Sequence, residues 1–177
     1  ESNLEGYMQY TQQWKRLQAS AGLRIEYMQT VGTLKSYQDG TVMEENKNCH
    51  TRFFPNLSVS YDLDNSSKLT LAYSKRQDKP RYEDLNPFEY LLDELTYWKG
   101  NPFIQPQISH KISLGYTKNS LSLTLSYNLL NDYFTQLPDT YKKNCIVMTT
   151  KNIGKQKQLA LDLVYNRRLA SWWDIST

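Results

Sequence analysis

The side chains best suited to chemistry in this sequence are the carboxylates of one polar stretch, Glu83, Asp84, Glu89, Asp93 and Glu94. Clustered carboxylates can bind Ca²⁺ or act as a paired acid and base. Their spacing lacks the alternating oxygen ligands and the glycine of a calcium loop, and residues 88–98 could equally form a short amphipathic helix with a charged outer face. We therefore predict solvated charge here, with no metal site and no catalytic residue.

The histidines and cysteines give no stronger case for a metal or another cofactor. His50 and His110 have no partners at the spacing of a zinc site. The only two cysteines, Cys49 and Cys145, precede or begin predicted strands that lie four strand spacings apart, about 20 Å at about 4.8 Å each. Two free thiols and a Cys49–Cys145 disulfide both stay open, although the bridge would need mobile loops or a small closed barrel.

Enzymatic and nucleic-acid-binding functions have little support. The sequence contains no Gly-x-Ser-x-Gly elbow and no glycine-rich phosphate loop, so we predict that the chain is not an enzyme. The net charge is only +3, and the basic residues are scattered among eighteen acidic ones. No basic stripe could follow a phosphate backbone, and nucleic acid is not a predicted partner.

The clearest structural signal is a unit of two aliphatic residues and a tyrosine at alternate positions, which occurs six times. It occupies residues 23–27, 57–61, 69–73, 112–116, 123–127 and 161–165. Side chains of a strand point to alternate faces, so each unit has one apolar face and one face of mostly small, polar or charged residues. We predict strands over residues 5–15, 18–33, 52–62, 68–76, 108–118, 120–135, 145–166 and 171–177.

The lengths of the connections predict the topology. Short polar links at 62–67, 117–120 and 166–171 can join only antiparallel neighbours. Long connections at 35–51, 77–107 and 136–144 alternate with them. The predicted fold is all-β, an antiparallel up-and-down meander of about eight strands, with the short turns at one end and the long loops at the other. That asymmetry is typical of an outer-membrane β-barrel with periplasmic turns and extracellular loops.

Aromatic residues support a membrane setting. Six of them stand beside the short turns: Trp14, Tyr61, Tyr116, Tyr165, Trp172 and Trp173. Tyr and Trp favour the headgroup level of a bilayer, so we predict an aromatic girdle at this end. No run of about 18 apolar residues exists, which excludes a membrane helix. The low mean hydropathy of −0.70 is compatible with a barrel, whose strands show lipid only every second residue.

Two loop stretches carry a family resemblance. The sequence from Lys79 to Phe88 contains Tyr-Glu-Asp-Leu-Asn-Pro, residues 100–106 read Gly-Asn-Pro-Phe-Ile-Gln-Pro, and Ser109-His110 follows. Together with residues 53–61 and 152–155, they resemble the outer-membrane β-barrel family of TonB-dependent receptors common in Bacteroides-like bacteria. Lys79 stands where that family usually has arginine.

The resemblance implies a receptor in the bacterial outer membrane for ligand-gated uptake of a siderophore, cofactor or glycan, with outer-membrane lipid and the TonB complex as partners. We expect residues 1–177 to form one partial barrel domain, since neither a plug nor a TonB box is recognisable and eight strands are fewer than the roughly 22 of such transporters. The last residues lack the terminal aromatic of a finished barrel, which also predicts an excerpt.

Within that reading, the long loops 35–51 and 77–107 are the predicted sites of ligand contact. Four aromatic residues of the second loop could stack on a small-molecule chelate ring or a glycan: Tyr82, Phe88, Tyr97 and Trp98. Two alternatives stay open, because alternation does not say which face is inside. One is a soluble β-sandwich or lipocalin-like binding module, and the other is a small outer-membrane barrel or adhesin.

Overall fold

The computed structural model describes residues 2–35, 42–140, 145–170 and 172–176. Long alternating segments form one antiparallel meander, as predicted, in the order β1-β2-β3-β4-β7-β8-β9, with β10 paired to β9. Its strands are β1 (Ser2–Trp14), β2 (Leu17–Lys35), β3 (Val42–Asp62), β4 (Ser67–Asp78), β7 (Gln107–Lys118), β8 (Leu121–Thr140), β9 (Ile146–Ala170) and β10 (Trp173–Ser176). Within the described residues β1 pairs only with β2, so the sheet is open.

The register separates the two faces of the sheet cleanly. One row of directly paired residues crosses five strands and is entirely aliphatic: Val59, Leu71, Leu114, Leu125 and Leu161. The adjacent row, on the opposite face, is Ser60, Thr70, Gly115, Thr124 and Asp162. Paired neighbours share a face and successive residues alternate, so one face is apolar and the other is polar.

The apolar face is uncovered. Leu71 is 52 % exposed and Leu114 is 43 % exposed, although each has a paired strand on both sides. A soluble sandwich or lipocalin would turn these side chains into a core, because a contiguous apolar surface of this extent is unfavourable in water. The described residues provide nothing that covers this face.

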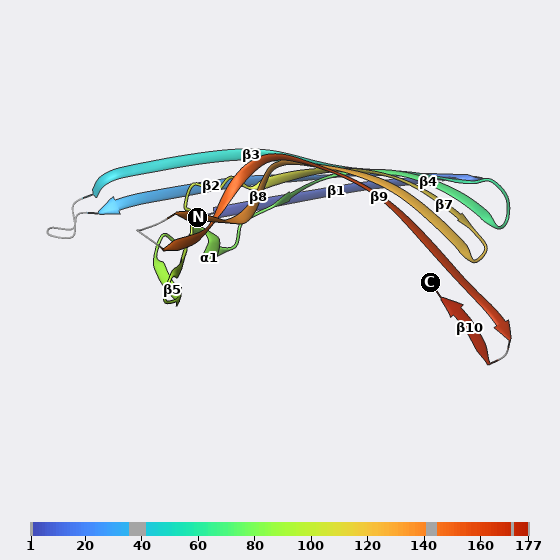
Figure 1. The fold of residues 1–177 in the computed structure, drawn as a ribbon. Coiled ribbons are helices and arrows are strands. Elements are labelled where there is room, and N and C mark those ends of the chain that lie inside the picture. The colour runs from blue at the N-terminus through green and yellow to red at the C-terminus, as the bar shows by residue number, and fades with distance from the viewer. Residues whose placement is uncertain (1, 36–41, 141–144, 171, 177) are drawn as a thin grey trace.

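The polar face lies on the inside of the curve. The sheet is bowed, and the connection between β4 and β7, which carries α1 (Tyr82–Leu85) and β5 (Glu89–Asp93), lies on its concave side (Figure 1). This connection meets the polar face, since the Lys79 Nζ lies 3.7 Å from the carboxylate of Glu26. Glu26 is buried and alternates along β2 with the exposed Ile25 and Tyr27. The curvature therefore encloses the polar face, as the wall of a barrel does around its lumen.

The short turns gather at one end and are linked to one another. The N–H of Asp62 donates to the carbonyl of Arg16 at 2.8 Å, and the N–H of Asn119 donates to the carbonyl of Ser66 at 3.0 Å. Asp64 braces its own turn by accepting hydrogen bonds from the N–H and hydroxyl of Ser66 at 2.8 and 2.9 Å. These bonds hold the pKa of Asp64 below its ordinary value, so its carboxylate stays charged at neutral pH.

At the other end the strands run further than predicted. Much of the 35–51 connection is strand, because β2 and β3 stay paired as far as Lys35 and Val42, and β8 and β9 as far as Thr140 and Ile146. Residues 36–41 and 141–144 lie outside the described part. The apolar alternation used for prediction ends before the strands do, because backbone pairing continues without apolar side chains where both faces contact water.

The alternative of a helix over 88–98 is wrong. These residues form a hairpin of β5 and β6 (Thr96–Lys99), and β6 pairs in parallel with the start of β9. Asp93 sets the hairpin turn by accepting a hydrogen bond from the N–H of Leu95 at 3.0 Å. The only helix in the described residues is the single turn of α1, which is far too short and polar to cross a bilayer.

Candidate ligand site in the loop between β4 and β7

The four predicted aromatic residues do not form one surface. In the hairpin, Tyr90 of β5 lies directly opposite Trp98 of β6, and Leu91 lies opposite Tyr97. Because successive strand residues point to opposite faces, Tyr97 and Trp98 face away from each other. Phe88 precedes the hairpin and is 70 % exposed.

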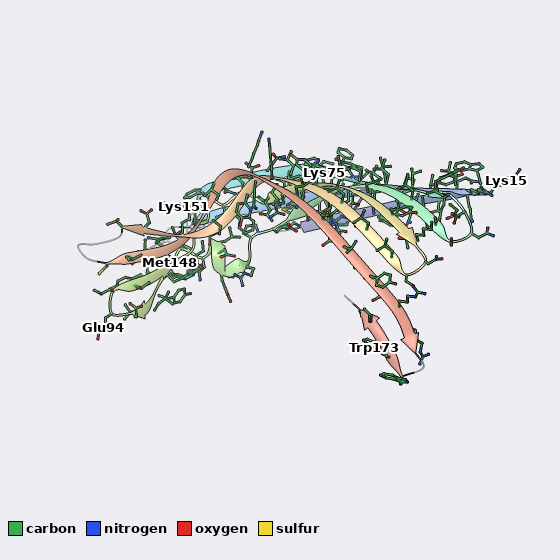
Figure 2. All side chains as sticks on the ribbon, turned by 45° about the vertical axis from the view of Figure 1, so that its right-hand side comes forward. Lys15, Lys75, Glu94, Met148, Lys151 and Trp173 are labelled. Atoms are coloured by element: carbon green, nitrogen blue, oxygen red, sulfur yellow. The ribbon has the colours of Figure 1, made fainter. Side chains whose placement is uncertain are left out.

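Two of the four, Tyr82 and Trp98, line a common cavity of about 320 Å³. Its remaining lining residues are Glu83, Asn86, Tyr90 and Leu92. Tyr90 was not predicted from the sequence, although its place opposite Trp98 makes it the natural partner once the hairpin is known. Figure 2 shows Glu94 at the tip of this hairpin, away from the sheet, and Met148 on the neighbouring β9.

Asp84 anchors the loop to the sheet. Its carboxylate is buried and accepts hydrogen bonds from the Thr150 hydroxyl of β9 at 3.0 Å and from the N–H of Arg81 at 3.2 Å. The Arg81 guanidinium lies 3.5 Å away. Thr150 is only 3 % exposed, so water cannot readily accept a hydrogen bond from its hydroxyl. The carboxylate of Asp84 takes that place. This member of the acidic stretch is structural, whereas the sequence predicted solvated charge.

The Gly-Asn-Pro stretch closes against α1. The N–H of Asn101 donates to the carbonyl of Asp84 at 2.6 Å, and its side-chain amide donates to the carbonyl of Thr150 at 3.2 Å. A Cβ at Gly100 would lie 2.3 Å from the carbonyl oxygen of Asn86 and 2.7 Å from that of Glu83. Only glycine allows the two backbones to approach this closely, which explains its place at the end of β6.

Asn152 of β9 fixes the far end of the loop. Its side-chain oxygen accepts from the N–H of Gln105 at 2.9 Å, and its amide donates to the Gln105 carbonyl at 2.9 Å. The same amide donates to the carbonyl of Asp132, in the β-bulge of β8. Ile104, beside this contact, is one of the few buried apolar residues, together with Leu130 and Val147 of the strands that the loop covers.

A second cavity, of about 360 Å³, lies on the other side of the anchor. Trp98 and Asp84 line it together with Lys79, Arg81, Phe134, Thr135, Gln136 and Thr150. Its two cations are already engaged, Lys79 with Glu26 and Arg81 with Asp84. Trp98 therefore lines both cavities. The larger one holds cations that already form ion pairs, and the smaller one holds the carboxylate of Glu83.

The remaining predicted residues are placed as follows. Trp14, Tyr61, Tyr116, Tyr165, Trp172 and Trp173 all lie at the short-turn end, where the rings of Trp172 and Trp173 stack at 6.1 Å. Figure 2 shows Trp173 and Lys15 at the end opposite Glu94. The girdle itself stays a prediction.

Both cysteines are free in the structure. Cys49 lies on β3 and Cys145 immediately before β9, with β4, β7 and β8 between those strands. This separation favours two free thiols over the Cys49–Cys145 disulfide, and the pairing stays a prediction. His50 lies on β3, and His110 of β7 contacts the Tyr73 hydroxyl through its Nδ1 at 2.9 Å. Across the described chain, no three His, Cys, Asp or Glu residues converge as a metal site would require.

Comparison with solved structures finds the same fold in two receptors and one transporter. The hemophore receptor HasR of Serratia marcescens, in complex with its hemophore HasA and heme, aligns with a TM-score of 0.69 at 15 % identity, over 93 % of this chain and 31 % of its own. The copper transporter OprC aligns with a TM-score of 0.68 at 16 % identity, over 97 % and 27 %. The siderophore receptor PirA of Pseudomonas aeruginosa gives 0.60 at 13 %, over 98 % and 40 %.

The chain thus spans less than half the length of each of these proteins. No curated protein is similar enough to match. The model of the outer membrane protein beta-barrel family matches all of residues 1–177, which places the chain in the bacterial outer membrane and sets the soluble alternative aside. With its open antiparallel meander and uncovered apolar face, the chain belongs to the outer membrane protein beta-barrel family.

Proposed function

We propose that this chain forms part of the wall of a TonB-dependent receptor that takes up a small-molecule or glycan ligand. Its apolar face contacts lipid and its polar face lines the lumen. The TonB complex acts through a region outside these 177 residues, and the chain itself carries no catalytic step. Structural relatives that bind heme, transport copper or receive siderophores support an uptake role of this general kind.

The observation that carries the proposal is the anchored loop on the polar, concave side of the sheet. Residues 79–106 are fixed to β9 through Asp84 and Asn152, so their aromatic cavity is held at the long-loop end. In outer-membrane barrels this end is extracellular. A ligand arriving from outside would meet Tyr82 and Trp98 before it entered the lumen.

Deletion of α1 together with most of the hairpin, which we call the hairpin deletion, tests this role. In the full-length receptor, residues 82–98 are replaced by a short Gly-Ser linker, and receptor-dependent growth on the transported nutrient is compared with that of the intact receptor. We expect growth to fall to the level of a receptor-null strain, because the ligand contacts are lost. Barrel assembly, followed by heat-modifiable migration in gels, should stay intact because the β4–β7 ladder from Ser67 to Asp78 is untouched. Unchanged growth with an assembled barrel would contradict the proposed role of this loop.

A further inference from the structure

The cavity between α1 and the hairpin is an open hollow lined by three aromatic residues, of which Tyr82 is 84 % exposed and Tyr90 49 % exposed. Tyr90 and Trp98 are cross-strand partners with their side chains on one face, and Tyr82 approaches from α1. The amide of Asn86 donates to the Tyr90 hydroxyl at 3.0 Å, while its oxygen accepts from the N–H of Phe88 at 3.2 Å. Because the hydrogen bond from Asn86 holds the Tyr90 ring in place, less side-chain entropy is lost at Tyr90 when a ligand binds.

The charge around this cavity is negative. Residues 82–99 contain five acidic side chains, Glu83, Asp84, Glu89, Asp93 and Glu94, and one basic side chain, Lys99. Asp84 is paired with Arg81, and Glu89 with Lys99 at 2.9 Å. Glu83, Asp93 and Glu94 have no ion pair within the described residues, and Glu83 lines the cavity itself.

Asp93, at the turn of the hairpin, contributes to this negative charge. A hydrogen bond from the N–H of Leu95, assisted by the side chain of Thr96, holds the pKa of Asp93 below its ordinary value. The cations of residues 79–99 are Lys79, Arg81 and Lys99, and they are engaged by Glu26, Asp84 and Glu89. No cation of this loop is therefore left to form an ion pair with the carboxylate of Glu83.

From this combination we infer that the cavity binds the cationic group of an organic ligand, an alkylammonium. The positive charge would lie against the faces of Tyr82, Tyr90 and Trp98, where ring quadrupoles attract it, and near the carboxylate of Glu83. A volume of about 320 Å³ accommodates a trimethylammonium group with part of its chain. Polyanionic ligands would be repelled by the same field. The inference rests on the proposed ligand role of this loop and names the chemical class of the ligand group.

Calorimetric titration of the purified full-length receptor with choline tests the inference. The matched probe is 3,3-dimethyl-1-butanol, which has the same shape without the charge. We expect choline to bind at least about tenfold more tightly than the neutral alcohol, because both the rings and Glu83 favour the cation. Equal binding of the two, or no binding of choline, would overturn the inference. Tighter binding of an uncharged oligosaccharide than of choline would also overturn it.

Paired variants locate the site. Trp98→Leu and Glu83→Gln should each weaken choline binding by about 3- to 30-fold, since each removes one attractive group. Their controls are Phe88→Leu and Glu94→Gln, an aromatic and a carboxylate of the same loop that do not line the cavity. Equal loss in variants and controls would contradict the assignment. Tyr82→Leu serves if Trp98→Leu misfolds, because Tyr82 is 84 % exposed and contributes little to packing.

This result is distinguishable from the test of the proposed function. If the hairpin deletion abolishes growth but choline does not bind, only the cationic assignment fails. If choline binds in the wild type with the expected variant pattern but the deletion leaves growth unchanged, the cation site stands and the uptake role of the loop fails.

Discussion

Replacing Leu125 with arginine should severely impair assembly of the receptor in the outer membrane. Leu125 belongs to the aliphatic row that crosses β3, β4, β7, β8 and β9, and it is 43 % exposed on the uncovered face. An arginine near the midplane of a barrel's lipid face costs about 2–4 kcal/mol of stability. Denaturant unfolding of the full-length receptor in phospholipid vesicles measures this loss.

The matched control is Thr124→Arg, one residue earlier on the same strand. Thr124 belongs to the polar row beside Gly115 and Asp162, so its substituent points to the opposite side of the sheet. We expect a change of less than about 1 kcal/mol, because lumen substitutions are tolerated much better than charges facing lipid. A larger loss for Thr124→Arg than for Leu125→Arg would mean that the apolar face is the inner one.

Replacing Asp84 with alanine should release the loop between β4 and β7 from the sheet. The change leaves the Thr150 hydroxyl, which is 3 % exposed, without its acceptor and removes the partner of Arg81. A buried polar group left unsatisfied costs about 1–3 kcal/mol. Trypsin should then cut after Arg81 and Lys99 much faster than in the wild type, as gel electrophoresis and mass spectrometry of the intact receptor would show.

Two further variants test whether faster cleavage is due to the loss of the Asp84 anchor. Glu83→Ala changes the neighbouring carboxylate of α1, which is exposed and has no ion pair among the described side chains, so cleavage rates should stay near those of the wild type. Asp84→Asn retains an oxygen that can accept from Thr150 and should give an intermediate rate. Cleavage of Asp84→Ala at the wild-type rate would show that the anchor does not hold the loop.

Much of the sheet was predictable because the alternation of apolar and polar residues can be recognised within each strand alone. A strand with lipid on one side and polar surroundings on the other must alternate, so Leu123, Leu125 and Tyr127 mark β8 without knowledge of its neighbours. Short turns then force antiparallel pairing, which fixes the strand order. The predicted strand began too late in β3 and stopped too early in β8, because beyond the apolar band the residues no longer need to alternate.

The loop was less predictable because its structure depends on distant residues. The hairpin of β5 and β6 pairs with β9 about fifty residues later, and Asp84 is buried only because Thr150 meets it there. The sequence alone predicted Asp84 to be solvated charge, and it placed Asn152 in the family resemblance without indicating its contact with Gln105. Tyr97 and Trp98 are adjacent aromatic residues whose separation onto two faces becomes evident only once the hairpin is known.

The orientation of the two faces is the central claim, and spin-label accessibility along β8 tests it most directly. Cys49 and Cys145 are first replaced by serine, and single cysteines are introduced at positions 121–129 of the full-length receptor in lipid vesicles. Labels at the odd positions, which include Leu121, Leu123 and Leu125, should be accessible to oxygen dissolved in the bilayer, and labels at the even positions to a water-soluble nickel chelate. The opposite alternation, or equal access of the nickel chelate to every position, would contradict an apolar face that contacts lipid.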